Sequence, residues 1–401
     1  MGSDLGSAQI GDCTPAGQPL PPLNPDPQIP LGIYVHVPFC ATRCGYCDFN
    51  TYTAAELGGA SHSGWLTALR RELQQAAAIC GGIDVQTVFV GGGTPSLLGA
   101  HRLAEVLGVV RDSFALAASV EVTTEANPES TSREFFDTIR AAGYTRISLG
   151  MQSASPRVLA VLERTHSPGR ALAAARQARA AGFEHLNIDL IYGTPGETDA
   201  DLLDSIDAAL STGVDHVSAY ALIVEDGTAL ARRVRRGELP TPDDDVLAHR
   251  YGLIDTRLDE AGLSWYEVSN WSRPGGECRH NLGYWGGGQW WGAGPGAHGF
   301  IGDVRWWNVK HPNTYAGLLD SGQTPIAGYE QLSTRDRHVE TVLLGIRLRT
   351  GLAQSMLSAA EQRRARAAVA AALLTIHDER LVLTDRGRLL ADAVVRDILD
   401  D

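Results

Sequence analysis

From Ile33 to about residue 222, short runs rich in β-branched residues alternate with longer stretches that place apolar residues at helical spacing. A chain that alternates in this way favours parallel strands joined by helical crossovers, because each helix returns the chain to the same edge of the sheet. Six such units can be read, fewer than a closed TIM barrel contains. The sequence therefore predicts an α/β fold with an incomplete, TIM-like (βα)6 barrel.

The elements of this barrel can be placed by residue number. Strands are expected at residues 33–37, 87–90, 120–124, 146–150, 186–191 and 216–222. Helices are expected at residues 65–78, 102–114, 132–142, 156–161, 169–181 and 199–212. In a parallel barrel the loops after the carboxyl ends of the strands build the ligand site. Residues that directly follow each strand are therefore the first candidates for function.

Two further parts are expected to flank the barrel, which would span residues 31–225. Residues 1–30 are rich in Gly, Pro, Ser and Asp, and we expect a disordered leader because they hold too little apolar surface to order themselves. After residue 225 the pattern changes to an aromatic and Gly-rich stretch and then to helical segments. We expect residues 226–401 to form a smaller, mainly helical C-terminal domain, in which residues 359–399 resemble a winged helix.

Charge and cysteine content limit the partners and the compartment. The chain has 34 Lys and Arg against 47 Asp and Glu, and so acidic a surface repels phosphate backbones, so we expect no nucleic-acid partner. Half of the cysteines fall between Cys40 and Cys47, unlike a secreted disulfide framework, and Cys13 is expected to be an unpaired bystander. No stretch is apolar for long enough to cross a bilayer. The sequence predicts a cytoplasmic protein that is not an integral membrane protein.

One short loop carries three cysteines. Cys40, Cys44 and Cys47 follow the first expected strand with the spacing Cys-x-x-x-Cys-x-x-Cys. Closely spaced thiolates suit a [4Fe-4S] cluster, and three ligands leave one iron free to bind the amino and carboxylate groups of a small molecule. The alternative is a zinc site completed by His36 or Asp48, because zinc also accepts mixed thiolate, imidazole and carboxylate ligands.

The loop also resembles a known family. Its sequence CxxxCxYC is similar to the cluster loop of radical SAM enzymes, and YVHVPFC at residues 34–40 resembles the oxygen-independent coproporphyrinogen III oxidase branch. The likeness continues, in the family's order, through GGGTP at 91–95, EANP at 125–128, GMQS at 150–153, NIDLIYG at 187–193 and YA at 220–221. The resemblance implies a radical SAM barrel in which S-adenosylmethionine (SAM) binds the open iron of the cluster.

The same resemblance assigns residues to SAM. It implies that Gly92, Gly93 and Thr94 contact the amino group of SAM, that Tyr34 reaches a SAM molecule beside the cluster, and that the backbone of Tyr46 meets the adenine. Polar residues at or beyond strand ends would bind the ribose, the methionine carboxylate and adjoining groups: Glu125, Gln152, Arg164 and Asp189. Taken singly, each polar residue could equally be a capping residue and each aromatic a packing residue.

A second motif lies beyond the expected barrel. The sequence HNLGYW at 280–285, like CDF at 47–49, resembles relatives known as heme chaperones of the HemW type, and the resemblance implies that HNxxYW binds heme. The side chains of His280 and Tyr284 can both ligate heme iron. Such a His and Tyr are, without the resemblance, more often packing and hydrogen-bonding residues. Nearby residues could cover the porphyrin or add a thiolate: Trp285, Trp290, Trp291 and Cys278.

Two functions of different classes follow from the resemblance. The first is a heme chaperone that holds a [4Fe-4S] cluster, SAM and heme and passes heme to apo-hemoproteins, including respiratory membrane proteins, without coproporphyrinogen oxidase activity. The alternative is the oxidase itself, which cleaves SAM to a 5'-deoxyadenosyl radical and decarboxylates coproporphyrinogen III. In the oxidase the loop continues as CxxCxC, with a further cysteine after the third one, where this chain has Asp48-Phe49. Together with the HNxxYW motif, this difference favours the chaperone, and an oligomer is compatible with either function.

Overall fold

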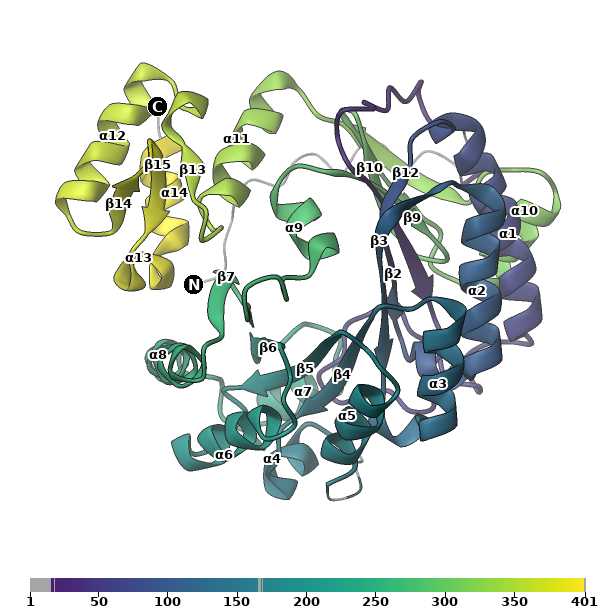
Figure 1. Cartoon of the computed structure of the whole chain (residues 1–401), viewed down its shortest axis with the longest axis horizontal. Helices are drawn as coiled ribbons and strands as arrows, with labels where there is room; N and C mark the ends of the chain where they lie inside the picture. Colours follow the sequence, from purple (N-terminus) through teal and green to yellow (C-terminus); the bar gives the residue numbers. More distant parts are fainter. Residues whose placement is uncertain (1–15, 18, 165–166, 168, 400–401) are drawn as a thin grey trace.

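The structure, a computed structural model, describes residues 16–17, 19–164, 167 and 169–399. Its centre is a curved sheet in which six parallel strands lie side by side in chain order, as predicted (Figure 1). They are β1 (Leu31–Val37), β2 (Val85–Gly92), β3 (Leu116–Ala126), β4 (Arg146–Gln152), β5 (His185–Tyr192) and β6 (His216–Ala221). Each strand overlaps the one expected at its place, so the β-branched runs located all six.

Helices between these strands cover the outer, convex face of the sheet (Figure 1). They are α1 (His62–Cys80), α2 (Ala100–Ser113), α3 (Arg133–Ala142), α4 (Pro156–Val161), α5 (Arg170–Ala180) and α6 (Asp199–Leu210). Thr198 and Asp201 form a reciprocal capping box that starts α6. On the inward face of α1, Leu69 and Leu73 are fully buried in the core shared with the sheet. Among the described helices, none is both long and apolar enough to span a membrane.

The sheet continues past both of its expected edges. At one edge, α7 (Ala229–Arg235) and α8 (Asp244–Glu260) lead to β7 (Ser264–Glu267) and β8 (Asn270–Ser272), and β8 pairs antiparallel with β6. At the other edge, β9 (Gln289–Ala293) pairs parallel with β1, followed by β10 (His298–Ile301), β11 (Val304–Asn308), α10 (Pro312–Asp320) and β12 (Ile326–Gln331). In the described part of the chain the outer strands β12 and β7 do not pair. The barrel is therefore incomplete, as predicted.

The domain boundary expected after residue 225 falls inside this sheet. Strands β7 to β12 all lie after that residue, and Ile254, Trp271 and Ile326 belong to the same core as β1 to β6. The sequence changes there because the strands change from parallel to antiparallel pairing, which alters their composition. A second core begins only at Val342, so the independent C-terminal unit is shorter than expected.

This C-terminal unit is mainly helical, as predicted. It contains α11 (Thr334–Gly345), β13 (Leu352–Ala353), α12 (Ala359–Ala370), β14 (Leu374–His377), β15 (Arg380–Leu383), α13 (Asp385–Leu389) and α14 (Ala391–Leu399). The strands form a small antiparallel sheet, and the expected order of helix, strand pair and helix is present. Arg388 joins the unit to the barrel through an ion pair with Asp255, at 2.5 Å, and a position 4.7 Å above the ring of Trp265.

The stretch before β1 is only partly described. Residues 1–15 and 18, which include Cys13, lie outside the described residues. Residues 19–30 are described, and there the expectation of a disordered leader is wrong. Leu20 and Leu23 pack against the core, and the backbone of Asp26 exchanges hydrogen bonds of 2.9 and 2.8 Å with the side chain of Gln289. Local composition could not predict this order, because the partners lie in β9, far along the sequence.

Candidate functional site

The loop with the three cysteines begins at the carboxyl end of β1. Its base is closed by backbone hydrogen bonds from Tyr52 to Pro38, at 2.7 Å, and from Cys40 to Tyr52, at 3.0 Å. On the opposite side of the loop, Gly45 donates to the carbonyl of Leu162 and accepts from the amide of Leu230. The loop is therefore held at its base and at its tip, and it stands where parallel barrels place their sites.

The three thiols of this loop are half-buried and free of disulfides. The hydroxyl of Thr94 lies 3.5 Å from the Cys40 sulfur, and the guanidinium of Arg164 donates to the Cys44 sulfur at 3.3 Å. Burial raises the pKa of Cys47, and the charges of Cys44 and Cys40 raise it further. A cationic donor beside closely placed thiols fits a three-thiolate cluster, which carries negative charge.

The zinc alternative finds less support in the geometry. Both ring nitrogens of His36 are engaged: Nε2 donates to the carbonyl of Asn50 at 2.9 Å, and Nδ1 accepts from the hydroxyl of Tyr34 at 3.0 Å. Within the described residues, no three His, Cys, Asp or Glu side chains converge into a ready-made metal site. His36 is therefore built as a structural residue beneath the loop, and a metal group here requires the thiols to draw together.

The glycine loop after β2 packs directly against the cysteine loop. Gly93 and Thr94 donate their backbone N–H groups to the carbonyls of Val37 and Phe39, at 2.7 and 2.8 Å. A side chain on Gly93 would stand 2.6 Å from the Phe39 carbonyl and 3.1 Å from the Cys40 sulfur. Gly93 is thus needed for backbone packing next to the cysteines, while contact of this loop with the amino group of SAM stays a prediction.

Two of the expected SAM residues face one another across a cavity. Gly92, in a left-handed conformation, donates to Glu125 at 3.0 Å, and Asp189 accepts from Ser148 and Asn187 at 2.8 and 2.7 Å. Burial raises the pKa of Glu125 to about 8, with a further contribution from the Asp189 carboxylate. Burial also raises the pKa of Asp189. These carboxyl groups are suited to bind hydroxyl or amino groups of a ligand.

The remaining expected SAM residues lie around the cysteine loop. Gln152 ends β4 with a positive φ of 67°, an unusual backbone for this residue type at a strand end. Arg164 reaches the Gly150 carbonyl at 3.3 Å as well as Cys44. Tyr46 packs its ring against a small apolar cluster that includes Leu162. Arg164 therefore contacts the loop and Gln152 ends the strand nearby, whereas the Tyr46 ring serves packing.

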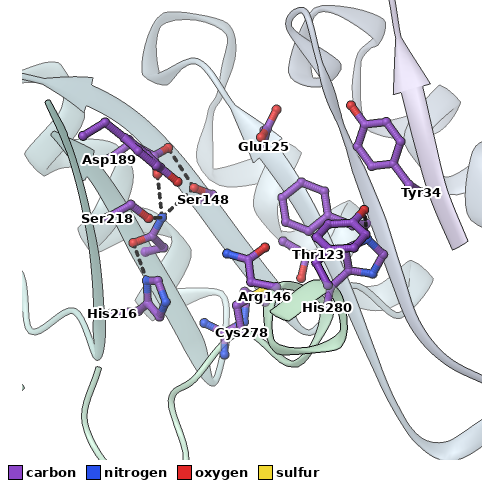
Figure 2. A pocket seen from close by; sticks show the side chains of 15 residues that line it. Tyr34, Thr123, Glu125, Arg146, Ser148, Asp189, His216, Ser218, Cys278 and His280 are labelled. Atoms are coloured by element: carbon purple, nitrogen blue, oxygen red, sulfur yellow. Dashed lines mark hydrogen bonds between the residues drawn. The ribbon is translucent and has the colours of Figure 1, made fainter. Parts of the chain in front are cut away.

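The cavity extends from these carboxyl groups deep into the barrel. Figure 2 shows Glu125 and Tyr34 near one end and Arg146, Cys278 and His280 near the other. Its volume is about 210 Å³. The walls are formed by Tyr34, Phe89, Thr123, Glu125, Arg146, Ser148, Asn187, Asp189, His216, Ser218, Tyr220, Cys278, His280, Asn281 and Tyr284. The lumen is unusually polar for a barrel interior, which is filled by apolar layers in closed barrels.

The HNxxYW motif forms helix α9 (Arg279–Trp285), which lies on the concave side of the sheet (Figure 1). His280 is buried, and its ring nitrogens bond Thr87 at 2.8 Å and Tyr284 at 2.7 Å. Gly32 leaves room for this ring, because a side chain there would stand 3.2 Å from it. Burial lowers the pKa of His280 to about 3. In this conformation the two candidate heme ligands are bonded to each other, so ligation of heme requires this hydrogen bond to open.

Sequence reasoning missed the buried ion pair that holds α9. Glu121 pairs with Arg146 at 3.2 Å and accepts from the backbone N–H groups of Arg279 and His280 at 3.1 and 3.0 Å. Arg146 also donates to the carbonyls just before α9, while its Nη1 is buried without a hydrogen-bond partner in the described structure. Charged residues inside two expected strands were the available signal, since a barrel interior rarely holds them without a partner.

The expected residues thus form two groups within one lumen. Cysteines, glycines and most SAM candidates meet at the carboxyl ends of the strands. His280 and Tyr284 lie toward the amino ends, beside Thr87 and Glu121. Tyr34 and Glu125 line the cavity between the two groups. The sequence had not predicted that His280 and Tyr284 would line the same cavity as Glu125 and Asp189.

Comparison with known proteins agrees with this architecture. Residues 34–209 match the radical SAM superfamily, and residues 332–390 match the HemN C-terminal domain, which coincides with the C-terminal unit. The structure of coproporphyrinogen III oxidase (HemN) from Escherichia coli superposes with a TM-score of 0.78 at 23% identity, covering 93% of this chain and 91% of the other, and supports the fold.

Curated relatives extend over nearly the whole chain. The heme chaperone HemW of Mycobacterium tuberculosis is 69% identical over 95% of this chain and 97% of its own length. HemW of Bacillus subtilis is 31% identical over 90% of this chain and 97% of its own. Such identity over almost the full length confirms the resemblance read from the motifs, and the chain belongs to the HemW family within the radical SAM superfamily.

Proposed function

We propose that this protein is a cytoplasmic heme chaperone that holds a [4Fe-4S] cluster, SAM and heme, and that delivers heme to apo-hemoproteins. The observation that carries the proposal is its 69% identity, over 95% of the chain, to a protein named as a heme chaperone. Cys40, Cys44 and Cys47 would hold the cluster, and the bound cluster would supply an electron to SAM. Membership of the radical SAM superfamily implies both groups.

The chain's own residues suit the binding of SAM at the carboxyl ends of the strands. Glu125 and Asp189 offer carboxyl groups to hydroxyl or amino donors, and Arg164 offers a cation beside Cys44. The loop of Gly92, Gly93 and Thr94 adjoins Glu125, to which Gly92 donates at 3.0 Å, and Gln152 ends β4 at the same edge of the sheet. Tyr34 lines the cavity that leads from this end into the barrel, and its hydroxyl adds a further polar group there.

His280 and Tyr284 are the proposed heme ligands. The hydrogen bond of 2.7 Å between these two side chains occupies both groups, and the Tyr284 ring also contacts the ring of Trp290. Opening this bond would free an imidazole and a phenol, both of which ligate heme iron. Recipient hemoproteins, including those of respiratory membranes, would then compete for the same iron.

The alternative is oxygen-independent coproporphyrinogen III oxidase, favoured by the fold of the E. coli oxidase. A single preparation distinguishes the two functions. Anaerobically reconstituted protein is titrated with heme and then incubated with coproporphyrinogen III, SAM and a reductant. A chaperone binds heme with a defined absorption spectrum, transfers it to apo-hemoprotein and leaves coproporphyrinogen unchanged. Repeated conversion of coproporphyrinogen to protoporphyrinogen would establish the oxidase instead.

A further inference from the structure

The far end of the cysteine loop is held by a part of the chain that lies outside the six-strand barrel. Asn50, three positions after Cys47, donates one N–H of its side-chain amide to the carbonyl of Pro295 and the other to the carbonyl of Lys310, both at 2.9 Å. The two carbonyls come from the segments before β10 and after β11. Asn50 thus joins the cysteine loop to the antiparallel extension of the sheet.

The remaining polar atoms of Asn50 are engaged as well. Its amide oxygen accepts from the hydroxyl of Tyr52 at 3.2 Å, and its backbone carbonyl accepts from His36 at 2.9 Å. An asparagine side chain has two N–H donors and one carbonyl acceptor, and here each one has a partner. Aspartate would lose both donors, and serine could supply only one. The site therefore selects asparagine by its hydrogen-bonding pattern.

The glycines opposite Asn50 are shaped to this contact. Gly296 has a φ of +74°, and a side chain on it would stand 2.5 Å from the Asn50 amide nitrogen. Gly294 has a φ of +107°, and a side chain there would stand 2.5 Å from the His36 carbonyl. Both glycines need a left-handed backbone and leave no space for a Cβ atom. The 294–296 turn thus packs directly against Asn50, just after the last cysteine of the loop.

This turn is itself anchored in the core. The fully buried carboxylate of Glu72 in α1 accepts from the backbone of Gly294 at 2.8 Å and from Asn308 at 2.7 Å. Tyr315 and Trp291 also donate to it, at 2.5 and 3.4 Å. The turn that carries the carbonyl of Pro295 is therefore tied to a buried group of α1, which gives the cysteine loop an anchored contact.

We propose that Asn50 is the positioning residue of the cysteine loop, and that it sets the placement of Cys47 by clamping the loop exit to the carbonyls of Pro295 and Lys310. The inference rests on the proposed cluster at Cys40, Cys44 and Cys47. The described hydrogen bonds of the Asn50 side chain go to Pro295, Lys310 and Tyr52 and not to the thiols, so Asn50 acts through the backbone that follows Cys47. The clamp would keep the Cys47 thiol in reach of the group that Cys40 and Cys44 would hold with it.

The test compares Asn50→Ala and Asn50→Asp with the wild type and with Asn313→Ala. Asn313 is a matched control, because its side-chain amide also donates to two backbone carbonyls, of Leu57 and Gly58, at 3.1 and 3.0 Å. Iron and sulfide are measured after anaerobic reconstitution, together with the rate of iron release to a ferrous chelator. The EPR spectrum of the reduced cluster is recorded with and without SAM, and thermal unfolding is followed on cluster-free protein.

Both Asn50 variants are expected to release iron about tenfold faster than wild type, as for the loss of two hydrogen bonds, and to give a changed EPR spectrum. Their cluster-free unfolding should shift no more than that of Asn313→Ala, whose iron release and spectrum should match wild type. Gly296→Ala would place a methyl group against the Asn50 side-chain amide and should also speed iron release. Release within twofold of wild type and unchanged spectra in all three variants would overturn the clamp. Wild type that takes up no iron would instead overturn the proposed cluster itself.

Discussion

The two ends of the barrel lumen are held in different ways. At the carboxyl ends, the cysteine loop is exposed on one side and secured by backbone hydrogen bonds at its base and tip. At the amino ends, α9 is buried and secured by the charged pair of Glu121 and Arg146. Backbone contacts let a loop exchange its side-chain ligands, whereas a buried ion pair holds one arrangement firmly. The carboxyl end is thus secured without using its thiols, and the amino end is secured through buried charges that contact α9.

The largest expected effect concerns the exposed end. Cys40→Ala, Cys44→Ala and Cys47→Ala should each lose most iron and sulfide, because each removes one of only three protein thiolates. Chemical analysis of anaerobically reconstituted protein measures this loss. Cys278→Ala at the buried end is the control and should retain the cluster. Four irons and four sulfides retained by all three loop variants would refute the assignment.

The next effect concerns the buried end. Glu121→Gln should destabilise the fold by about 3–5 kcal/mol, because it leaves the Arg146 guanidinium buried without its counter-charge. Asp137→Asn breaks an exposed ion pair with Arg133 and should cost less than about 1 kcal/mol. Denaturant unfolding of both variants measures the difference. Equal losses of unfolding free energy in the two variants would mean that the ion pair does not hold α9 in place, and the contrast between the two ends would fail.

A smaller effect is expected where the two ends meet. Asp189→Ala should weaken SAM binding about tenfold or more, because it removes a buried acceptor and leaves Ser148 and Asn187 without it. Calorimetry on anaerobic, cluster-loaded protein gives the dissociation constant. Asp112→Ala, on the exposed end of an outer helix, is the control. An unchanged affinity for Asp189→Ala would place SAM outside this cavity.

The smallest expected change is spectroscopic. His280→Ala and Tyr284→Phe should shift the heme absorption bands or weaken heme retention, since coordination of iron sets both. Cluster content should stay at the wild-type value, because the cysteines lie at the other end of the lumen. Heme spectra that are unchanged by both substitutions would show that heme binds elsewhere and that α9 has only a structural role.

The motif at the exposed end can be read from the sequence alone, whereas the contacts at the buried end cannot, for a physical reason. A cluster loop needs its ligands within a few residues, so the spacing of Cys40, Cys44 and Cys47 is visible in one dimension. His280 in α9 bonds Thr87 of β2, and its backbone N–H bonds Glu121 of β3. Contacts between a helix and strands so far apart in the chain leave no local pattern. The order of residues 19–30 escaped prediction for the same reason.

The cysteine loop and β1 both depend on partners far along the chain, which has a consequence for biosynthesis. The clamp between Asn50 and Lys310 joins residues 260 positions apart. At about 5–20 residues per second, roughly ten to fifty seconds pass between synthesis of the two partners. During that interval β1 has no neighbour on its β9 side and the cysteine loop has no support from the 294–310 region. A cluster added to the nascent chain during that interval would therefore sit on an unfinished loop, which favours assembly after the 294–310 region has been made.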